Sequence, residues 1–359
     1  MSEDINSVAR KLRIFSGAVL FFYVLTHLLN HSVNIVSIPA ADYIKNNYFH
    51  LLWKNPVGTV LLYGSFLIHI PLGFYDVGKR KSFKMSGREW IQIIFPILGF
   101  FFVSFHIVGA FIFTRIFDGK LTYELIFSEM LFNTPSGELI VNSILFGLIT
   151  IFIWVHGVIG INTLLRYNMK SYKKYVTYFY IIYIGTPVLG ISGFWAGLKE
   201  HSLMSYAKSL QGEGNFLASI IGKADSSEAD SLFKIVEPFI ESYYPLAVLG
   251  LIILAVINVV RAKYFGNIKI QYPGDRIVSI PKGTSILEAS QIAKIPHQAV
   301  CGGKGRCTTC RIKVISSKGP LPSPNSYEAR AIDRVGIEGD VRLACQLRPK
   351  GDVSVMPLV

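Results

Sequence analysis

Four cysteines lie in the carboxy-terminal region of this 359-residue chain, which contains no others. Three share one glycine-rich segment, CGGKGRCTTC, and the fourth follows after thirty-four intervening residues: Cys301, Cys307, Cys310 and Cys345. A 2Fe-2S cluster needs four thiolates, and glycines in the binding loop let backbone amides approach the sulfides. The spacing therefore predicts a one-electron iron-sulfur centre.

A structural zinc site is the alternative, because zinc also binds four thiolates. Zinc ribbons favour two C-x2-C pairs, whereas here only Cys307 and Cys310 have that spacing. The pattern favours the iron-sulfur centre. No cysteine is left over for disulfides, which fits a reducing compartment.

Histidine is the second residue type whose positions in the sequence indicate a ligand-binding site. Four successive long apolar segments each contain one at membrane depth: His27, His69, His106 and His156. Ionisable side chains are costly in hydrocarbon and usually face a bundle interior or a functional site. A single one would indicate a helix contact, but four in succession indicate ligands.

Their depths form two layers, because a helical residue advances about 1.5 Å along the axis. His69 and His156 lie roughly 15 Å from the inner boundary, whereas His27 and His106 lie roughly 21 and 27 Å from it. Two layers of two imidazoles are what two b-type haems require. We expect an outer pair, His27 with His106, and an inner pair, His69 with His156, about 6–12 Å apart in depth.

His31 complicates the outer layer, because it lies one helical turn after His27 and shares its face. Counted from Arg13, His31 matches the depth of His106 better; counted from the outer end, His27 does. His27 is the expected ligand, and His31 would then be a wet helix-end residue or part of a quinone or propionate site. Three further histidines are expected in solvated loops or turns, not as ligands: His50, His201 and His297. The alternative for His297, which precedes Cys301 by four residues, is that it tunes the cluster through a hydrogen bond.

The four histidines at membrane depth require helices that cross the membrane, and the composition of the chain is consistent with such helices. Hydrophobic residues make up 51% of the chain and the mean hydropathy is +0.42, too apolar for two soluble domains. Six stretches can cross a ~30 Å hydrocarbon core as helices: 14–36, 57–77, 91–113, 139–165, 175–198 and 240–260. The connections are expected to be loops, with room for a short surface helix in 199–239.

The basic residues give the direction of the spans. Lysines and arginines gather before the first stretch, in the second and fourth connections and after the last. Positive-inside bias therefore places both termini and the cysteine region in the cytoplasm. The net charge of +13 is scattered over the ends of apolar segments and not clustered on one soluble domain, so nucleic acid is not an expected partner.

From about Asn267 the pattern changes to short alternating segments. IKIQYP and RIVSI read as a hairpin around Pro273-Gly274-Asp275, and RIKVIS and 353–356 as further strands. Helical spacing covers 285–294 and SYEARAID. The predicted fold is a six-helix membrane bundle (1–262) with a four-helix haem-binding core, followed by a small α+β domain (267–359).

The segment CGGKGRCTTCRIKV with RLACQL resembles the cluster loop and last cysteine segment of 2Fe-2S ferredoxins. The five-residue first gap is similar to the adrenodoxin-type branch. The resemblance covers 267–359 and implies a β-grasp fold with Cys301, Cys307, Cys310 and Cys345 as ligands.

The membrane part resembles the dihaem cytochrome b anchors of quinol:fumarate reductases and succinate dehydrogenases. In RIFSGAVLFFYVLTH a glycine, Gly17, precedes His27 by ten positions, as in the first haem helix of those anchors. A quinone is the expected lipid-soluble partner. Arg13 and Ser16 at the inner end, or His31 and Arg115 at the outer end, are its candidate contacts.

The whole arrangement resembles the amino-terminal half of certain bacterial class III adenylate cyclases, which continue into a nucleotide-cyclising domain. This chain stops at Val359, where the ferredoxin fold should end, so we expect no cyclase activity from it. The resemblance implies a bacterial cytoplasmic membrane.

Together these features predict an electron-transfer component that links a quinone pool and two b-type haems to a cytoplasmic 2Fe-2S cluster. The alternative is a redox-sensing module whose output goes to a signalling partner. A proton-relaying ion transporter would explain neither the paired depths nor the cysteines.

Overall fold

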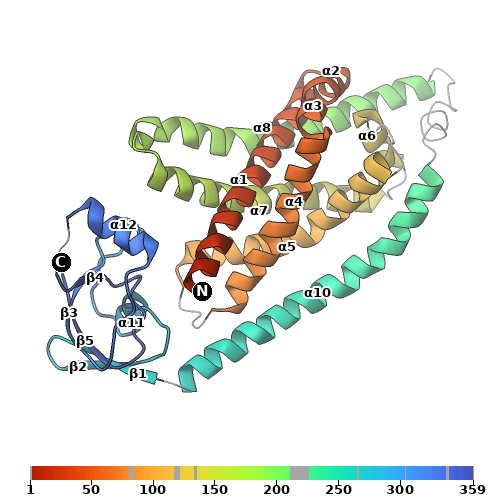
Figure 1. Ribbon diagram of the computed structural model, residues 1–359. Coiled ribbons are helices and arrows are strands. Elements are labelled where there is room, and N and C mark those ends of the chain that lie inside the picture. The colour runs from red at the N-terminus through yellow and green to blue at the C-terminus, as the bar shows by residue number, and fades with distance from the viewer. Residues whose placement is uncertain are drawn as a thin grey trace. The chain divides into compact units, whose positions relative to one another are not determined.

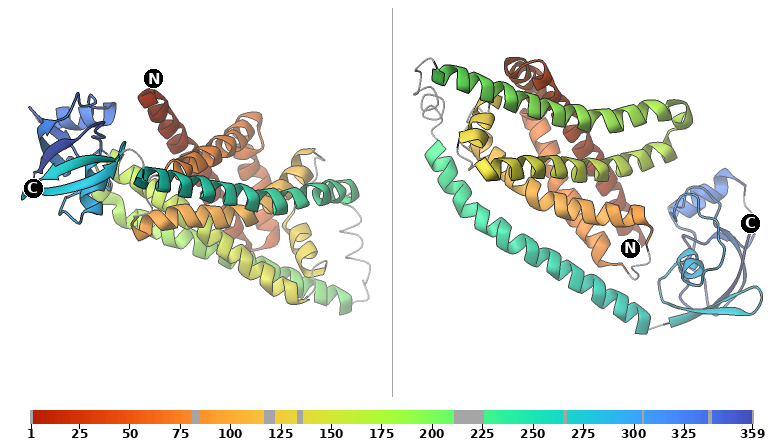
Figure 2. Two further views of the ribbon diagram at one scale, coloured as in Figure 1. Left: turned by 90° about the horizontal axis from the view of Figure 1, so that it is seen from below. Right: turned by 180° about the vertical axis from the view of Figure 1, so that it is seen from behind.

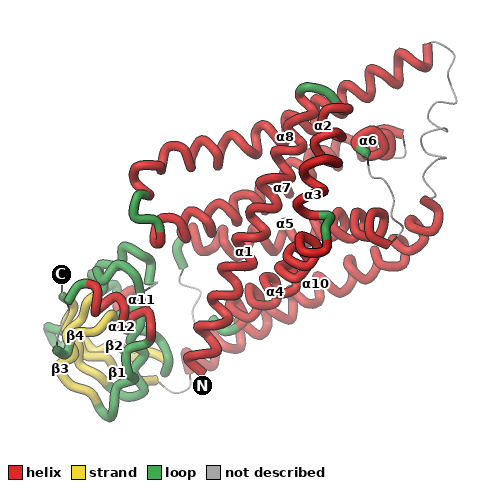
Figure 3. The backbone as a smooth tube through the Cα atoms, turned by 45° about the horizontal axis from the view of Figure 1, so that its top comes forward, coloured by secondary structure: helices red, strands yellow, loops and turns green. Residues whose placement is uncertain are grey.

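The structure is a computed structural model that describes residues 2–80, 85–116, 122–132, 136–210, 226–264, 267–303, 305–336 and 339–358. The chain divides into two compact units. One contains Val8–Gly73 and Gly87–Leu249, and the other contains Met1–Ser7, Phe74–Ser86 and Gly250–Val359. Helices fill the first unit, and every strand of the described chain lies in the second (Figure 3).

Within the described ranges, six helices are long and apolar enough to cross a membrane. They are α1 (Ser2–Ser32), α4 (Pro56–Gly78), α5 (Gly87–Phe111), α7 (Ser136–Asn168), α8 (Tyr172–Leu210) and α10 (Ser226–Tyr264) (Figure 1). The number of predicted spans is therefore confirmed, and the chain is a multi-pass membrane protein. Several helices continue past the predicted ends: α8 and α10 extend into the fifth connection, of which 211–225 lies outside the described residues.

Proline occurs inside four of these helices, at Pro71, Pro96, Pro187 and the pair Pro238 and Pro245. Membrane helices tolerate proline, because neighbouring helices, Ser and Thr side chains and local backbone adjustments satisfy the backbone groups that it leaves unbonded. The apolar length of each segment, and not its intrinsic propensity, thus determines these helices.

Aromatic side chains hold the helical unit together. Helix α5 packs along α7, and α7 and α8 form an antiparallel pair (Figure 2). Trp154 of α7 is only 2% exposed and donates its indole N–H to the Tyr183 carbonyl of α8 at 2.7 Å. Its ring stacks on Phe21 of α1, with centroids 5.1 Å apart. One tryptophan therefore ties three spanning helices together.

Helix α8 approaches the end of α1 at backbone contact. A Cβ at Gly193 would lie 2.1 Å from the carbonyl oxygen of His31, and one at Gly190 would lie 3.1 Å from that of Leu28. Small residues allow such close approach between membrane helices. The carboxy-terminal end of α1 is thereby fixed in place.

The prediction that the connections are loops is wrong for the first and third. The first contains α2 (Ile38–Ile44), the π-helix η2 (Lys45–Phe49) and α3 (His50–Trp53), whereas η1 (Val33–Ile35) ends the first span. The third contains the end of the π-helix η3 (Ile112–Ile116) and α6 (Tyr123–Phe132). Their apolar faces form a small core with α8, made of Ile38, Ala41, Tyr123, Phe127 and Leu198. These apolar runs are too short to span a membrane, so a search for spans does not find them.

The carboxy-terminal sheet has the order β2-β1-β5-β3-β4. Its strands are β1 (Asn267–Tyr272), β2 (Arg276–Pro281), β3 (Arg311–Ser317), β4 (Val341–Leu343) and β5 (Val353–Pro357). Strands β1 and β5 run parallel, and the remaining pairs are antiparallel. The predicted hairpin and later strands are confirmed, whereas the three-residue β4 was not predicted.

Two short helices, α11 (Ile286–Ile292) and α12 (Ser326–Arg334), complete this small α+β fold. Helix α11 begins with a capping box of Ser285 and Glu288, and α12 begins at the Asn325 cap. The fully buried core includes Ile270, Ile280, Ile312, Leu343 and Leu347. The predicted fold class, a helical membrane part followed by a small mixed-sheet domain, is confirmed.

We expect Gly193→Ala to lower the melting temperature of the detergent-solubilised chain by several degrees. The added methyl would force α8 away from the His31 carbonyl, and overpacking of this kind costs about 1–3 kcal/mol. Gly185→Ala is the control on the same helix, because a Cβ there meets nothing within 4 Å. Equal melting temperatures for the two variants would contradict this packing.

Candidate functional site

The four cysteines lie on two neighbouring segments, one before β3 and one after β4, where hydrogen bonds pair Cys301 with Cys307 and Cys310 with Cys345. Among the described residues, no three of them form a group that could hold a metal ion in this structure. Cys301, Cys310 and Cys345 are 3%, 1% and 4% exposed, whereas Cys307 is half-buried. The backbone amide of Ala344 donates to the Cys310 carbonyl at 2.8 Å, which joins the two cysteine segments. No disulfide links these four residues, so all four sulfurs remain thiols.

The loop backbone adopts the conformation that its glycines allow. Gly302, Gly303 and Gly305 have φ of +63°, +83° and +67°, and Thr308 has +59°. At Gly305 space is also limiting, because a Cβ would lie 2.9 Å from the Gln346 side chain. Such left-handed turns direct backbone amides into the concave side of a loop, where they favour negative charge.

Hydrogen bonds connect the sulfurs with one another and with neighbouring donors. The Thr309 hydroxyl lies 2.9 Å from Cys307 Sγ, and Gln346 Nε2 donates to Cys345 Sγ at 3.2 Å. A hydrogen bond from the Cys310 thiol, together with the Gln346 amide, lowers the pKa of Cys345 to about 7. That same bond raises the pKa of Cys310. Of these two thiols, Cys345 therefore forms the thiolate more readily, and thiolate is the form that binds metal.

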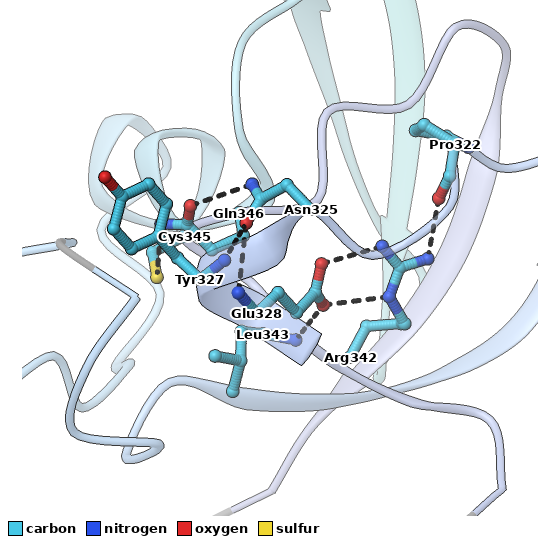
Figure 4. Close-up of polar contacts among 8 residues, drawn as sticks. All are labelled: Pro322, Asn325, Tyr327, Glu328, Arg342, Leu343, Cys345 and Gln346. Carbon is cyan, nitrogen blue, oxygen red and sulfur yellow. Dashed lines mark hydrogen bonds and ion pairs between the residues drawn. The ribbon is translucent and has the colours of Figure 1, made fainter. Parts of the chain in front are cut away.

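A buried ion pair between Glu328 and Arg342 lies next to the Cys345 segment (Figure 4). Glu328 is fully buried, and its carboxylate accepts two hydrogen bonds of 2.8 Å from the Arg342 guanidinium. The backbone amide of Leu343 also donates to Glu328, at 2.8 Å. Arg342 in turn donates to the Pro322 carbonyl. Helix α12 is thereby fixed to the strand that leads into Cys345.

His297 is not the solvated turn residue that the sequence suggested. Its half-buried ring lies 2.9 Å from the Ser290 hydroxyl, which also contacts the Tyr272 hydroxyl at 2.9 Å. Burial lowers the pKa of His297. His297 therefore packs against Ser290 of α11, four residues before the cysteine loop begins.

In the helical unit, the inner pair of histidines meets across α4 and α7. The ring centroids of His69 and His156 are 6.2 Å apart. His69 Nδ1 lies 3.1 Å from the Arg13 carbonyl and 3.3 Å from the Ser16 hydroxyl, so Nε2 is its remaining nitrogen. His156 Nδ1 is buried without a hydrogen-bond partner. A Cβ at Gly17 would lie 2.8 Å from the His69 ring.

The outer pair meets across α1 and α5. The ring centroids of His27 and His106 are 6.0 Å apart. His31 lies beside them, with its Nε2 3.1 Å from His27 Nε2 and its Nδ1 3.2 Å from the Tyr123 hydroxyl. His31 is thus part of a polar cluster and not a wet helix end, and the choice between His27 and His31 as ligand stays open.

Both pairs touch α1, which gives their separation. The inner pair contacts α1 at Gly17, and the outer pair includes His27 of the same helix. Ten residues of helix correspond to about 15 Å. This is wider than the 6–12 Å expected from depth counting, which assumed that all helices meet the boundary at the same level.

Two other expectations about polar residues need correction. His201 is not in a wet place: it lies within α8, is 1% exposed, and contacts the Ser128 hydroxyl at 2.9 Å. His50 is half-buried in α3, where burial and then the charge of Lys45 lower its pKa to about 4. Arg115 donates to the Trp53 and Lys54 carbonyls, so it caps a helix end.

Sequence reasoning missed the residues that support the cysteines, namely Thr309, Asn325, Glu328, Arg342 and Gln346. Their types are ordinary surface types, and their roles depend on contacts between segments far apart in the chain. One signal was available: Gln346 follows Cys345 directly, which places an amide within reach of the sulfur.

Comparison with known proteins defines the class of the carboxy-terminal part. Residues 270–350 match the family model of the 2Fe-2S iron-sulfur cluster binding domain. The chain therefore combines a multi-pass membrane part with a 2Fe-2S iron-sulfur domain, and the ferredoxin resemblance is confirmed there. The dihaem and cyclase resemblances stay predictions.

Among individual proteins, the chain is similar to the F component of Na(+)-translocating NADH-quinone reductase. It is 32% identical over 111 residues to that of Pseudomonas paraeruginosa, covering 30% of this chain and 26% of the relative. It is 31% identical over 91 residues to that of Methylococcus capsulatus, covering 25% and 21%. The chain thus spans about a quarter of the length of these relatives.

We expect Glu328→Ala to destabilise the cysteine domain by about 3–5 kcal/mol, because it leaves the largely buried Arg342 guanidinium without its partner. A urea titration of the full chain, followed by the visible circular dichroism of the domain, measures the loss. Lys318→Ala is the control: this 84% exposed residue lies 3.8 Å from Asp352, and such a pair contributes less than about 1 kcal/mol. Equal midpoints for the two variants would refute the role of Glu328.

Proposed function

We propose that this chain is a membrane-bound electron-transfer protein with two b-type haems and one 2Fe-2S cluster. The outer haem would be held by His27 and His106, the inner haem by His69 and His156, and the cluster by Cys301, Cys307, Cys310 and Cys345. When bound, both kinds of group supply reversible one-electron chemistry. The observation that carries the proposal is the meeting of the histidines in two separate pairs, each across two helices.

The distances within the pairs fit a shared metal. An imidazole nitrogen lies about 2 Å from a metal ion that it binds. Two imidazoles on opposite sides of one iron therefore have ring centroids roughly 6 Å apart. The centroid distances of 6.0 and 6.2 Å match this value.

The surroundings of the inner pair also fit ligation. A metal-binding histidine usually donates its other ring N–H to a carbonyl, which fixes the tautomer and the ring orientation. The Arg13 carbonyl can accept this hydrogen bond from His69 Nδ1. At the outer pair, the contact between His27 and His31 means that one of them would give up this hydrogen bond to bind iron.

The cysteine loop fits a 2Fe-2S cluster by its donors. The sulfurs of Cys307 and Cys345 already accept or share hydrogen bonds with Thr309 and Gln346. Left-handed glycines keep the loop open for further backbone amides. The proposal divides the chain into a dihaem part, 1–262, and a cluster domain, 267–359.

We place the cluster domain and both termini in the cytoplasm, because the basic residues gather on the corresponding connections. A quinone is the proposed lipid-soluble partner, supported by the name of the relatives, NADH-quinone reductase. The cluster domain would exchange its electron with a cytoplasmic redox protein.

The composition of the purified chain tests the proposal. A pyridine haemochrome assay with non-haem iron and acid-labile sulfide counts should give about two haems, two irons and two sulfides per chain. His106→Ala and His156→Ala should each remove one haem, while His50→Ala, outside the spanning helices, should retain both. Protein from a haem-supplied host that carries no haem would refute the dihaem assignment.

Gly17→Ala should disturb the inner haem selectively. Its methyl group would lie 2.8 Å from the His69 ring and displace that ligand, while the outer pair is remote from the change. Optical redox titration should then show one altered and one unchanged haem component. Gly64→Ala, where a Cβ meets nothing within 4 Å, is the control on α4, and identical titrations for both variants would contradict the prediction.

A further inference from the structure

The side chain of Gln346 lies between the amino-terminal end of α12 and the cysteine loop (Figure 4). Its Oε1 accepts a hydrogen bond from Asn325 Nδ2 at 3.0 Å. Its Nε2 donates to the Gly303 carbonyl at 3.1 Å and to Cys345 Sγ at 3.2 Å. One amide thus joins a helix cap to a sulfur of the candidate cluster site.

The orientation of this amide follows from the helix cap. Asn325 Oδ1 accepts hydrogen bonds from the backbone amides of Tyr327 and Glu328, each at 3.0 Å. Because the oxygen of Asn325 is used by the helix, its Nδ2 group faces Gln346 and requires an acceptor there. Gln346 must therefore present Oε1 to Asn325 and its N–H groups to Gly303 and Cys345.

The surroundings keep this arrangement in place. The buried pair of Glu328 and Arg342 fixes the first turn of α12, so the cap cannot move away from the loop. On the other side, Gly305 leaves the space that Gln346 occupies, since a Cβ there would lie 2.9 Å from the amide carbon. The amide is therefore preorganised and does not need to reorient when the charge at the sulfur changes.

We propose that Gln346 raises the reduction potential of the 2Fe-2S cluster and that Asn325 is the positioning residue that sets the direction of the Gln346 amide. The inference rests on the proposed cluster at this site. Reduction adds one electron and so one negative charge to the cluster and its thiolates. An N–H donor to a ligand sulfur stabilises the reduced form more than the oxidised form, and hydrogen bonds to sulfur are among the factors that set cluster potentials.

The test is a redox titration of the purified full chain, with the reduced cluster followed by electron paramagnetic resonance. Gln346→Leu removes the donor while nearly keeping the volume. At the midpoint potential of the wild-type cluster, we expect the ratio of reduced to oxidised cluster to fall about tenfold, which is 59 mV for a one-electron couple. Gln271→Leu, a change of the same kind at an exposed position on β1, is the control and should leave the ratio unchanged.

Asn325→Ser tests the positioning role without touching Gln346. Serine is a good helix cap and is uncharged, but its hydroxyl takes the place of the asparagine Cγ. It is therefore one bond short of Nδ2, the atom that reaches Gln346 Oε1 at 3.0 Å. We expect a fall in the ratio of the same sign, and the double variant Asn325→Ser with Gln346→Leu should equal Gln346→Leu alone. Such non-additivity is the signature of two residues that act through one interaction.

Each outcome decides one claim. An unchanged potential in Gln346→Leu with the cluster retained overturns the inference and leaves the proposed function intact. If Gln346→Leu loses its cluster, Asn325→Ser decides: a lowered ratio supports the inference and an unchanged ratio overturns it. Additive effects in the double variant overturn the positioning role of Asn325. A wild-type chain without any cluster refutes the proposed function itself, and the inference with it.

Discussion

An imidazole placed in hydrocarbon needs a partner, and this constraint shapes the helical unit. His27, His69, His106 and His156 come from four different spanning helices, so their polar nitrogens can meet only if the helices pack in one particular way. Helix α1 makes this possible. It contributes His27 to the outer pair and the Arg13 carbonyl, Ser16 and Gly17 to the inner pair. Its carboxy-terminal end is in turn fixed by the backbone contact with Gly193 of α8.

In the cysteine domain, contacts from neighbouring segments hold the cysteine loop in place. A loop with three left-handed glycines cannot hold its shape alone, so the surrounding residues hold it. The Glu328–Arg342 pair anchors α12, the cap of α12 orients Gln346, and Gln346 reaches the sulfur of Cys345. The stability of the helix and the electrostatics of the site are thus parts of one hydrogen-bonded network.

The sequence predicted what depends on local pattern. The apolar length of the segments predicted the six spanning helices, and the alternation of apolar residues predicted the hairpin of β1 and β2. The helical rise predicted two layers of histidines, and in the structure the ring centroids within the two pairs are 6.0 and 6.2 Å apart. It could not give what depends on packing between distant segments. The apolar faces of α2 and α6 are buried where they pack against α8, and His201 is buried where α8 meets Ser128 of α6. For the same reason, the roles of Asn325 and Glu328 were not visible in their residue types.

The central claim is that the histidine pairs and the cysteine loop form one electron pathway. The most direct test is to mix the full chain in lipid nanodiscs with a lipid-soluble hydroquinone and to follow haem absorbance and the paramagnetic signal of the cluster in freeze-quenched samples. The account predicts that both change, and that the cluster no longer responds when His156→Ala has removed the inner haem. A cluster that responds equally fast in His156→Ala, or a cluster that never responds while the haems do, would contradict it.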